Sequence, residues 1–199
     1  MKLLILYIFL SCSLITKGQV IEDNIQTHLI NPFKIDSFLI YSLECSGDMI
    51  SLDTCGYEKP KYVFWKQDSK YFLKKFDYCN EFKTIQIDSN NPLRFYIVNK
   101  EIIDKEEIKN PTYYNTKGNK SSIVTLTVDH ACYHELTLHL KTNSKIKHVN
   151  TYYLDFAKFD NGRKNIFYNT NQKTKLKSLT DKISELIKKL EISKVFQVE

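Results

Sequence analysis

The clearest pattern along the chain is a helical repeat of apolar residues near its C-terminal end. These residues recur at steps of three and four: Leu176, Leu179, Ile183, Leu186, Ile187 and Leu190. Charged side chains fill most positions between them, and Ser178 with Asp181 resembles a capping pair at the helix start. A helix with one apolar stripe must bury it, so we expect this helix to pack on a sheet of the same chain.

Runs of β-branched and aromatic residues predict that this sheet is antiparallel. Residues 62–66 and 71–76 are expected to form a hairpin with a two-residue loop at 68–69. That loop would place Trp65 opposite Phe72, and apolar partners stacked across the strands favour this register. Other segments have strand-like composition or alternation: 49–52, 84–87, 93–98, 123–128, 135–141 and 146–156.

Two further segments favour helix. Apolar residues within 35–43 fall at helical spacing after Pro32, and the charged segment 101–109 has the composition of a short helix. Residues 20–32 are polar and mixed, which is typical of a short lead-in. Segment 113–122 has the polar composition of a flexible connection.

Together these elements predict an α+β fold. An antiparallel sheet of hairpins and meanders is packed by the C-terminal amphipathic helix, with an N-terminal helix as a further element. Hydrophobic residues make up 42% of the chain, which is enough for a sizeable core. The length of segment 19–199 suits one domain.

The first residues have the features of an export signal. A lysine precedes the unbroken apolar run 3–10, and small residues at Thr16 and Gly18 suit cleavage before Gln19. We therefore expect residues 1–18 to be a signal peptide and the remainder to be an exported domain.

The alternative to cleavage before Gln19 is a lipid anchor at Cys12. The Phe-Leu-Ser-Cys sequence at residues 9–12 approximates a lipobox, in which Cys12 would carry the lipid. Cleavage is the favoured route. Either route predicts a secreted, periplasmic or cell-envelope location.

The remaining cysteines suit disulfides, because exported proteins mature in oxidising compartments. Four of them lie beyond the signal: Cys45, Cys55, Cys79 and Cys132. Four cysteines allow three different sets of two disulfides. The predicted hairpin brings Cys55 and Cys79 to the same open end, which is within reach of a bridge. We therefore predict Cys55–Cys79, which leaves Cys45–Cys132 as the second bridge.

Charge is unevenly distributed. The chain carries a formal charge of +6, but residues 19–149 balance 17 basic against 17 acidic side chains, whereas residues 150–199 hold 10 basic and 6 acidic ones. Lys173, Lys175 and Lys177 concentrate this excess, which either meets an anionic partner or is a solvated helix face; we favour the second. The excess is modest and lacks a basic-aromatic motif, so no nucleic acid partner is expected. No segment after the signal reaches the roughly 18 apolar residues of a membrane span.

One segment, 129–135, concentrates reactive side chains. If it is extended, His130, Cys132 and His134 lie on one face about 6.5 Å apart, and two imidazoles with a thiolate could hold zinc or copper. Against this, an oxidising compartment favours Cys132 in a disulfide, and the spacing matches no zinc motif. His130 and His134 are therefore only minor metal candidates, and we predict no cofactor and assign no catalytic residue.

Consecutive aromatic residues at 113–114, 152–153 and 167–168 are the other distinctive feature. In a strand, such neighbours point to opposite faces, so one of each pair would be exposed and suited to a protein or sugar partner. Ordinary half-buried packing is the favoured interpretation.

The sequence contains no motif that specifies a reaction. We therefore expect a small exported or envelope-associated binding module whose partner is another protein or a cell-surface component. The alternative is an envelope hydrolase or a metal-binding protein that uses the strand carrying His130 and His134.

Overall fold

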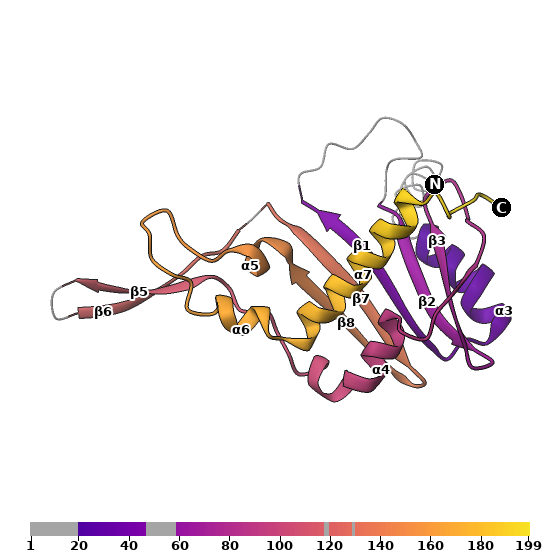
Figure 1. The fold of residues 1–199 in the computed structure, drawn as a ribbon, viewed down its shortest axis with the longest axis horizontal. Helices are drawn as coiled ribbons and strands as arrows, with labels where there is room; N and C mark the ends of the chain where they lie inside the picture. The colour runs from indigo at the N-terminus through magenta and orange to yellow at the C-terminus, as the bar shows by residue number, and fades with distance from the viewer. Residues whose placement is uncertain (1–19, 47–58, 118–119, 129) are drawn as a thin grey trace, which may run out of the picture.

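The computed structural model describes residues 20–46, 59–117, 120–128 and 130–199, and its centre is a six-stranded antiparallel sheet. The strand order is β4-β3-β2-β1-β7-β8 (Figure 1). The strands span Ser37–Cys45 (β1), Lys61–Gln67 (β2), Lys70–Phe76 (β3), Ile85–Ile87 (β4), Cys132–Leu140 (β7) and Asn143–Asn150 (β8). The central strand β1 thus joins a β2-β3-β4 meander to a β7-β8 hairpin, and the predicted α+β fold class is confirmed.

One face of the sheet is covered by α7 (Lys175–Ile192), with α4 (Pro92–Ile103) beside it (Figure 1). The predicted C-terminal helix is therefore confirmed. Its cap differs from the prediction, because the Thr174 side chain accepts from the Lys177 N–H. The core between this helix and the sheet includes Leu39, Phe64, Leu73, Leu136, Leu138, Leu176, Leu179 and Ile183.

The opposite face is covered over β1–β3 by an N-terminal helical segment (Figure 1). It consists of α2 (Val20–Asn24), the π-helical η2 (Ile25–Ile30) and α3 (Asn31–Phe33). The prediction of a lead-in at residues 20–32 was wrong. Ile21, Ile25 and Leu29 recur every four residues and pack in one buried cluster with Val63 and Trp65.

The segment 35–43, predicted as helix, forms most of strand β1. Because β1 is central and covered on both faces, the neighbouring residues Phe38 and Leu39 are both buried, and so are Tyr41 and Ser42. Such a strand has a nearly continuous apolar run instead of alternation. Periodicity alone does not separate that run from a buried helix.

The segment 93–98, predicted as strand, lies in helix α4. The Asn91 side chain accepts from the Arg94 N–H, and Pro92 occupies the first helical turn, so the local sequence starts a helix. The helix ends at Ile103, which leaves only the first residues of the predicted helix 101–109 in helical conformation.

The predicted β2-β3 hairpin is confirmed in detail. Trp65 pairs with Phe72, and the strands are joined by a two-residue loop. Both loop residues, Asp68 and Ser69, have positive φ angles of 47° and 64°. This is the conformation of a type I′ turn, whose twist matches that of the flanking strands. Here it is reached without glycine.

A second, two-stranded sheet projects from the body (Figure 1). It consists of β5 (Thr112–Lys117) and β6 (Lys120–Thr125), so most of the segment predicted to be flexible is a hairpin. Two short helices, α5 (Thr151–Asp155) and α6 (Tyr168–Gln172), follow β8. The Asn150 side chain accepts from the N–H groups at the start of α5, which ends the strand predicted over 146–156.

A disulfide joins Cys45 to Cys132 across β1 and β7, in directly opposite positions of the ladder. This is the pairing that the sequence argument left as the second bridge. Cys79 is also disulfide-bonded. Cys55 and the predicted strand at 49–52 lie outside the described residues, so the Cys55–Cys79 pairing stays a prediction.

The packing predicts a large difference between two positions of α7. Leu179 is 0% exposed, whereas Ile192 is 71% exposed. Leu179→Ala should lower the free energy of unfolding by about 2–5 kcal/mol through lost burial and a residual cavity. Ile192→Ala should change it by less than about 0.5 kcal/mol. Urea unfolding followed by circular dichroism measures both, and equal effects would contradict this placement of the helix.

Candidate functional site

His134 lies in a pocket between the sheet and α7, and its neighbours come from distant parts of the chain. The pocket has a volume of about 360 Å³. Its lining residues are Tyr41, Leu43, Cys45, Lys59, Pro60, Tyr62, His134, Ser184, Ile187 and Lys188. Of the two predicted metal candidates, only His134 lines this pocket, because His130 precedes β7 and is exposed.

A chain of polar side chains runs along the inner wall of this pocket. The Tyr41 hydroxyl lies 2.9 Å from Nδ1 of His134 and 3.5 Å from Oγ of Ser184. Burial raises the pKa of Tyr41, with a smaller opposing effect of Ser184. Burial also lowers the pKa of His134, against the nearby Asp181 carboxylate. Both side chains are therefore neutral at pH 7.

This arrangement suits hydrogen bonding more than covalent or metal chemistry. The Ser184 hydroxyl contacts Tyr41 instead of His134. Ser184 and His134 therefore do not form the nucleophile–base contact that acyl transfer requires. Cys132 is held in its disulfide. In the ranges that the structure describes, no group of three or more His, Cys, Asp or Glu side chains is arranged to hold a metal ion.

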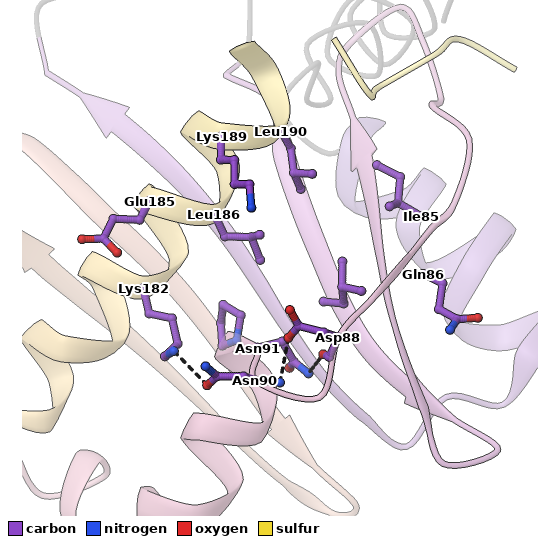
Figure 2. Close-up of a pocket in the computed structure, with 12 residues that line it drawn as sticks. Ile85, Gln86, Asp88, Asn90, Asn91, Lys182, Glu185, Leu186, Lys189 and Leu190 are labelled. Carbon is purple, nitrogen blue, oxygen red and sulfur yellow. Dashed lines mark hydrogen bonds between the residues drawn. The ribbon is translucent and has the colours of Figure 1, made fainter. Parts of the chain in front are cut away.

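A groove lies on the other flank of α7 (Figure 2). It has a volume of about 390 Å³. Leu186 and Leu190 of the helix and Ile85 of β4 provide apolar surface, and Lys182 reaches across to Asn90 with a distance of 3.1 Å (Figure 2). The groove borders the β4 edge of the sheet.

Strand β8 forms the opposite edge of the sheet. A two-residue turn pairs Leu140 with Asn143, and this register directs alternate backbone groups of β8 toward β7. The N–H and C=O groups of Ser144, Ile146 and His148 consequently point away from the sheet. No backbone hydrogen bond joins these three residues to any other residue of the described segments.

Two lysines of β8 are engaged on the α7 side of the sheet. Nζ of Lys147 donates to the carbonyl oxygens of Asp104 and Glu106 at 3.0 and 2.9 Å, and Nζ of Lys145 lies 3.7 Å from the Asp104 carboxylate. Burial, helped by the neighbouring Lys145 ammonium, lowers the pKa of Lys147. The ammonium groups of Lys145 and Lys147 therefore lie over the α7 face of the sheet and do not line the outer edge of β8.

In two of the three pairs of consecutive aromatic residues, one ring is more exposed than its neighbour. Tyr114 is exposed, while the Tyr113 ring lies under the Arg163 guanidinium at 4.9 Å. Tyr152 is exposed and Tyr153 is buried. Residues 167–168 are both half-buried, so this third pair has no fully exposed ring.

Two of the groups near the start of α7 that could hold an anion already have carboxylate partners. The Leu176 N–H already donates to the Glu106 carboxylate at 2.7 Å, and Lys177 pairs with Asp181 at 2.6 Å. This favours the predicted interpretation of a solvated helix face.

Comparison with protein-family models, with curated proteins and with solved structures finds no match to this chain. None of the helices described is both long enough and apolar enough to cross a membrane.

Burial of His134 predicts a specific pH dependence of stability. The pKa of His134 is about 6.5 when unfolded and lower when folded, so the unfolded state binds more protons as the pH falls below 6.5. The free energy of unfolding should therefore fall between pH 6.5 and the folded pKa. Urea unfolding from pH 8 to pH 5 should show a smaller loss for His134→Gln than for the wild type. The exposed His130→Gln is the control, and parallel profiles for wild type and His134→Gln would contradict the assignment.

Proposed function

We propose that this protein is an exported, non-catalytic binding module that takes up an extended segment of a partner protein at the edge of β8. The observation that carries the proposal is the row of outward-facing backbone groups at Ser144, Ile146 and His148, which have no backbone partner within the part of the chain that the structure describes. An unpaired edge can add a strand from another chain, whose main-chain hydrogen bonds supply affinity.

Export is supported by the disulfide chemistry. The Cys45–Cys132 bridge, together with the bonded state of Cys79, fits an oxidising compartment better than the cytosol. The proposed signal at residues 1–18 and the alternative lipid anchor at Cys12 lie outside the described residues. Both routes would deliver the domain to the cell envelope or its exterior.

The protection that usually prevents strand addition is weak at β8. Edge strands are commonly guarded by extreme shortness, by proline or by outward charges. This strand has eight residues and no proline. Its lysines Lys145 and Lys147 are held on the loop at Asp104 and Glu106. By contrast, the other edge strand, β4, has only three residues.

Side chains beside the edge indicate the chemistry of the partner. Ile146 is 61% exposed on the face of the sheet opposite α7 and pairs with Thr137 of β7. On the same face, His148 lies 3.4 Å from the Glu135 carboxylate. An added strand would place an apolar or β-branched residue opposite Ile146, flanked by polar residues.

A proline substitution tests the proposal without breaking the sheet. The Ile146 N–H points outward, so Ile146→Pro removes one donor of the edge while the β7 ladder keeps its hydrogen bonds. Random peptides displayed on phage would be selected on the oxidised protein, and the selected peptide would be titrated by fluorescence anisotropy. Ile146→Pro should weaken its binding by about tenfold or more.

The matched control is Gln86→Pro. Gln86 pairs with Phe72 and has the same outward backbone orientation in β4, at the other edge of the sheet. Its binding should equal that of the wild type. Unchanged binding to Ile146→Pro would overturn the proposal, as would a selection that yields no binding peptide. Loss confined to Gln86→Pro would move the site to β4.

A further inference from the structure

The hairpin of β5 and β6, which we call the arm, has one edge that is bonded to the body of the protein. On β5, the Thr112 N–H donates to Oδ1 of Asn165 at 3.1 Å, and the Thr112 carbonyl accepts from the Ile166 N–H at 2.9 Å. The backbone groups of Thr112 therefore point out of the arm. The base of the β5 edge is thus already engaged.

The edge formed by β6 is open. Thr112 pairs with Thr125, and in an antiparallel ladder both residues of such a pair direct their backbone groups outward. The same orientation recurs at every second residue of β6, which gives Ile123 and Ser121. Within the segments that the structure describes, no backbone hydrogen bond joins these three residues of β6 to a segment other than β5.

The arm also has one engaged face and one exposed face. On the first face, the Arg163 guanidinium lies 4.9 Å from the centre of the Tyr113 ring and donates to Oδ1 of Asn115 at 2.6 Å. On the other face, Tyr114 and Ile123 are directly opposite each other and are 57% and 66% exposed. An open edge and an exposed apolar pair therefore coincide at Ile123.

A sheet of two strands gains from the addition of further strands. A two-stranded hairpin is marginally stable in water, and three or more strands with an apolar face are needed for independent stability. The arm has two strands and projects from the body (Figure 1). Strands added at the β6 edge would widen this sheet and cover Ile123.

The β6 edge is complementary to a second copy of itself. A two-fold axis through Ile123 places this residue opposite its own counterpart and Ser121 opposite Thr125 of the second copy. All three residues direct their N–H and C=O groups outward, so each pair can exchange reciprocal hydrogen bonds. The exposed side chains of Tyr114, Ile123 and their two counterparts then form one apolar row across four strands.

Charge favours the same partner. Residues 121–125 carry no charged side chain, so two copies of this segment meet without repulsion. In β8, by contrast, a two-fold axis through Ile146 would place Lys145 opposite Lys147 of the second copy. Like charges directly opposite each other are destabilising. The β6 edge therefore suits pairing with itself, whereas the β8 edge suits a different chain.

We propose that two copies of this protein associate by antiparallel pairing of their β6 edges, so that the two arms form one four-stranded sheet. The contact is confined to the arms, and a small interface predicts a weak and reversible dimer. It does not use the β8 edge, so it goes beyond the binding function proposed above and stands independently of it.

Analytical ultracentrifugation of the oxidised protein over about 1–500 μM measures this association. The sedimentation coefficient should rise with concentration from the value of a monomer toward that of a dimer, with a dissociation constant of about 10–100 μM. A monomer at every concentration would overturn the proposal.

Proline substitutions on the two edges of the arm form a matched pair. Ile123→Pro removes the outward N–H of β6 at the two-fold axis, while the β5-β6 ladder keeps its hydrogen bonds. Thr116→Pro makes the same change at an exposed position of β5, because Thr116 pairs with Ser121 and has the same outward orientation. Ile123→Pro should raise the dissociation constant of the dimer by about tenfold or more, and Thr116→Pro should change it by less than about twofold. Equal effects would overturn the assignment to the β6 edge.

Opposite charges at position 123 test the two-fold axis without a change to the backbone. Ile123→Lys and Ile123→Glu should each associate at least about tenfold more weakly than the wild type, because each new charge lies opposite its own copy. An equimolar mixture of the two variants should associate about tenfold more tightly than either variant alone. A mixture that remains monomeric would contradict the proposal, as would wild-type association of either variant alone.

The β8 variant Ile146→Pro separates self-association from the binding of a partner segment. It should dimerise as the wild type does. Loss of the dimer in Ile146→Pro would place the contact between copies at β8 and would overturn the proposal for β6.

Discussion

The pairing of β1 with β7 is the interaction on which the rest of the structure depends. It joins two locally formed parts, the β2-β3-β4 meander and the β7-β8 hairpin, into one sheet. The Cys45–Cys132 bridge connects these strands across a separation of 87 residues. A two-stranded hairpin is marginally stable by itself in water, so β7 and β8 depend on this contact.

Helix α7 can lie across the sheet only because β1 and β7 meet beneath it. Its C-terminal part is held to the sheet by the Glu191 carboxylate. The Tyr62 hydroxyl and Nζ of Lys75 both donate to this carboxylate, at 2.7 and 2.8 Å. The Lys75 ammonium also lies 4.7 Å from the centre of the Phe82 ring. Burial and this carboxylate raise the pKa of Tyr62 well above its ordinary range, which keeps the donor protonated. The pocket that contains His134 lies on one flank of α7, and the groove lined by Leu186 and Leu190 lies on the other.

Local features of the fold were predictable because their signals are local. The β2-β3 register follows from a two-residue loop between apolar runs, and α7 follows from its repeat of apolar residues. Strand β1 and helix α4 were not predicted correctly, and the two reasons are opposite. β1 is buried on both faces by elements distant in sequence, whereas α4 has an adequate local signal in Asn91 and Pro92 that its apolar composition outweighed.

The candidate sites were predictable only in part. His134 stood out as a reactive side chain, but its contact with Tyr41 crosses from β7 to β1, and that with Ser184 requires α7 as well. Only the second half of β8 could be predicted from composition, as the start of the expected strand 146–156. Its position at the edge could not, because edge status depends on which strands pair and not on the strand itself.

Native-state amide hydrogen exchange of β8 is the most direct test of this account. If β8 is an open edge paired only with β7, the amides of Lys145, Lys147 and Val149 exchange slowly, and those of Ser144, Ile146 and His148 exchange rapidly. Uniformly slow exchange along the strand would mean that its outer edge is covered. Uniformly rapid exchange would mean that the β7-β8 pairing itself does not persist, and either result would contradict the account.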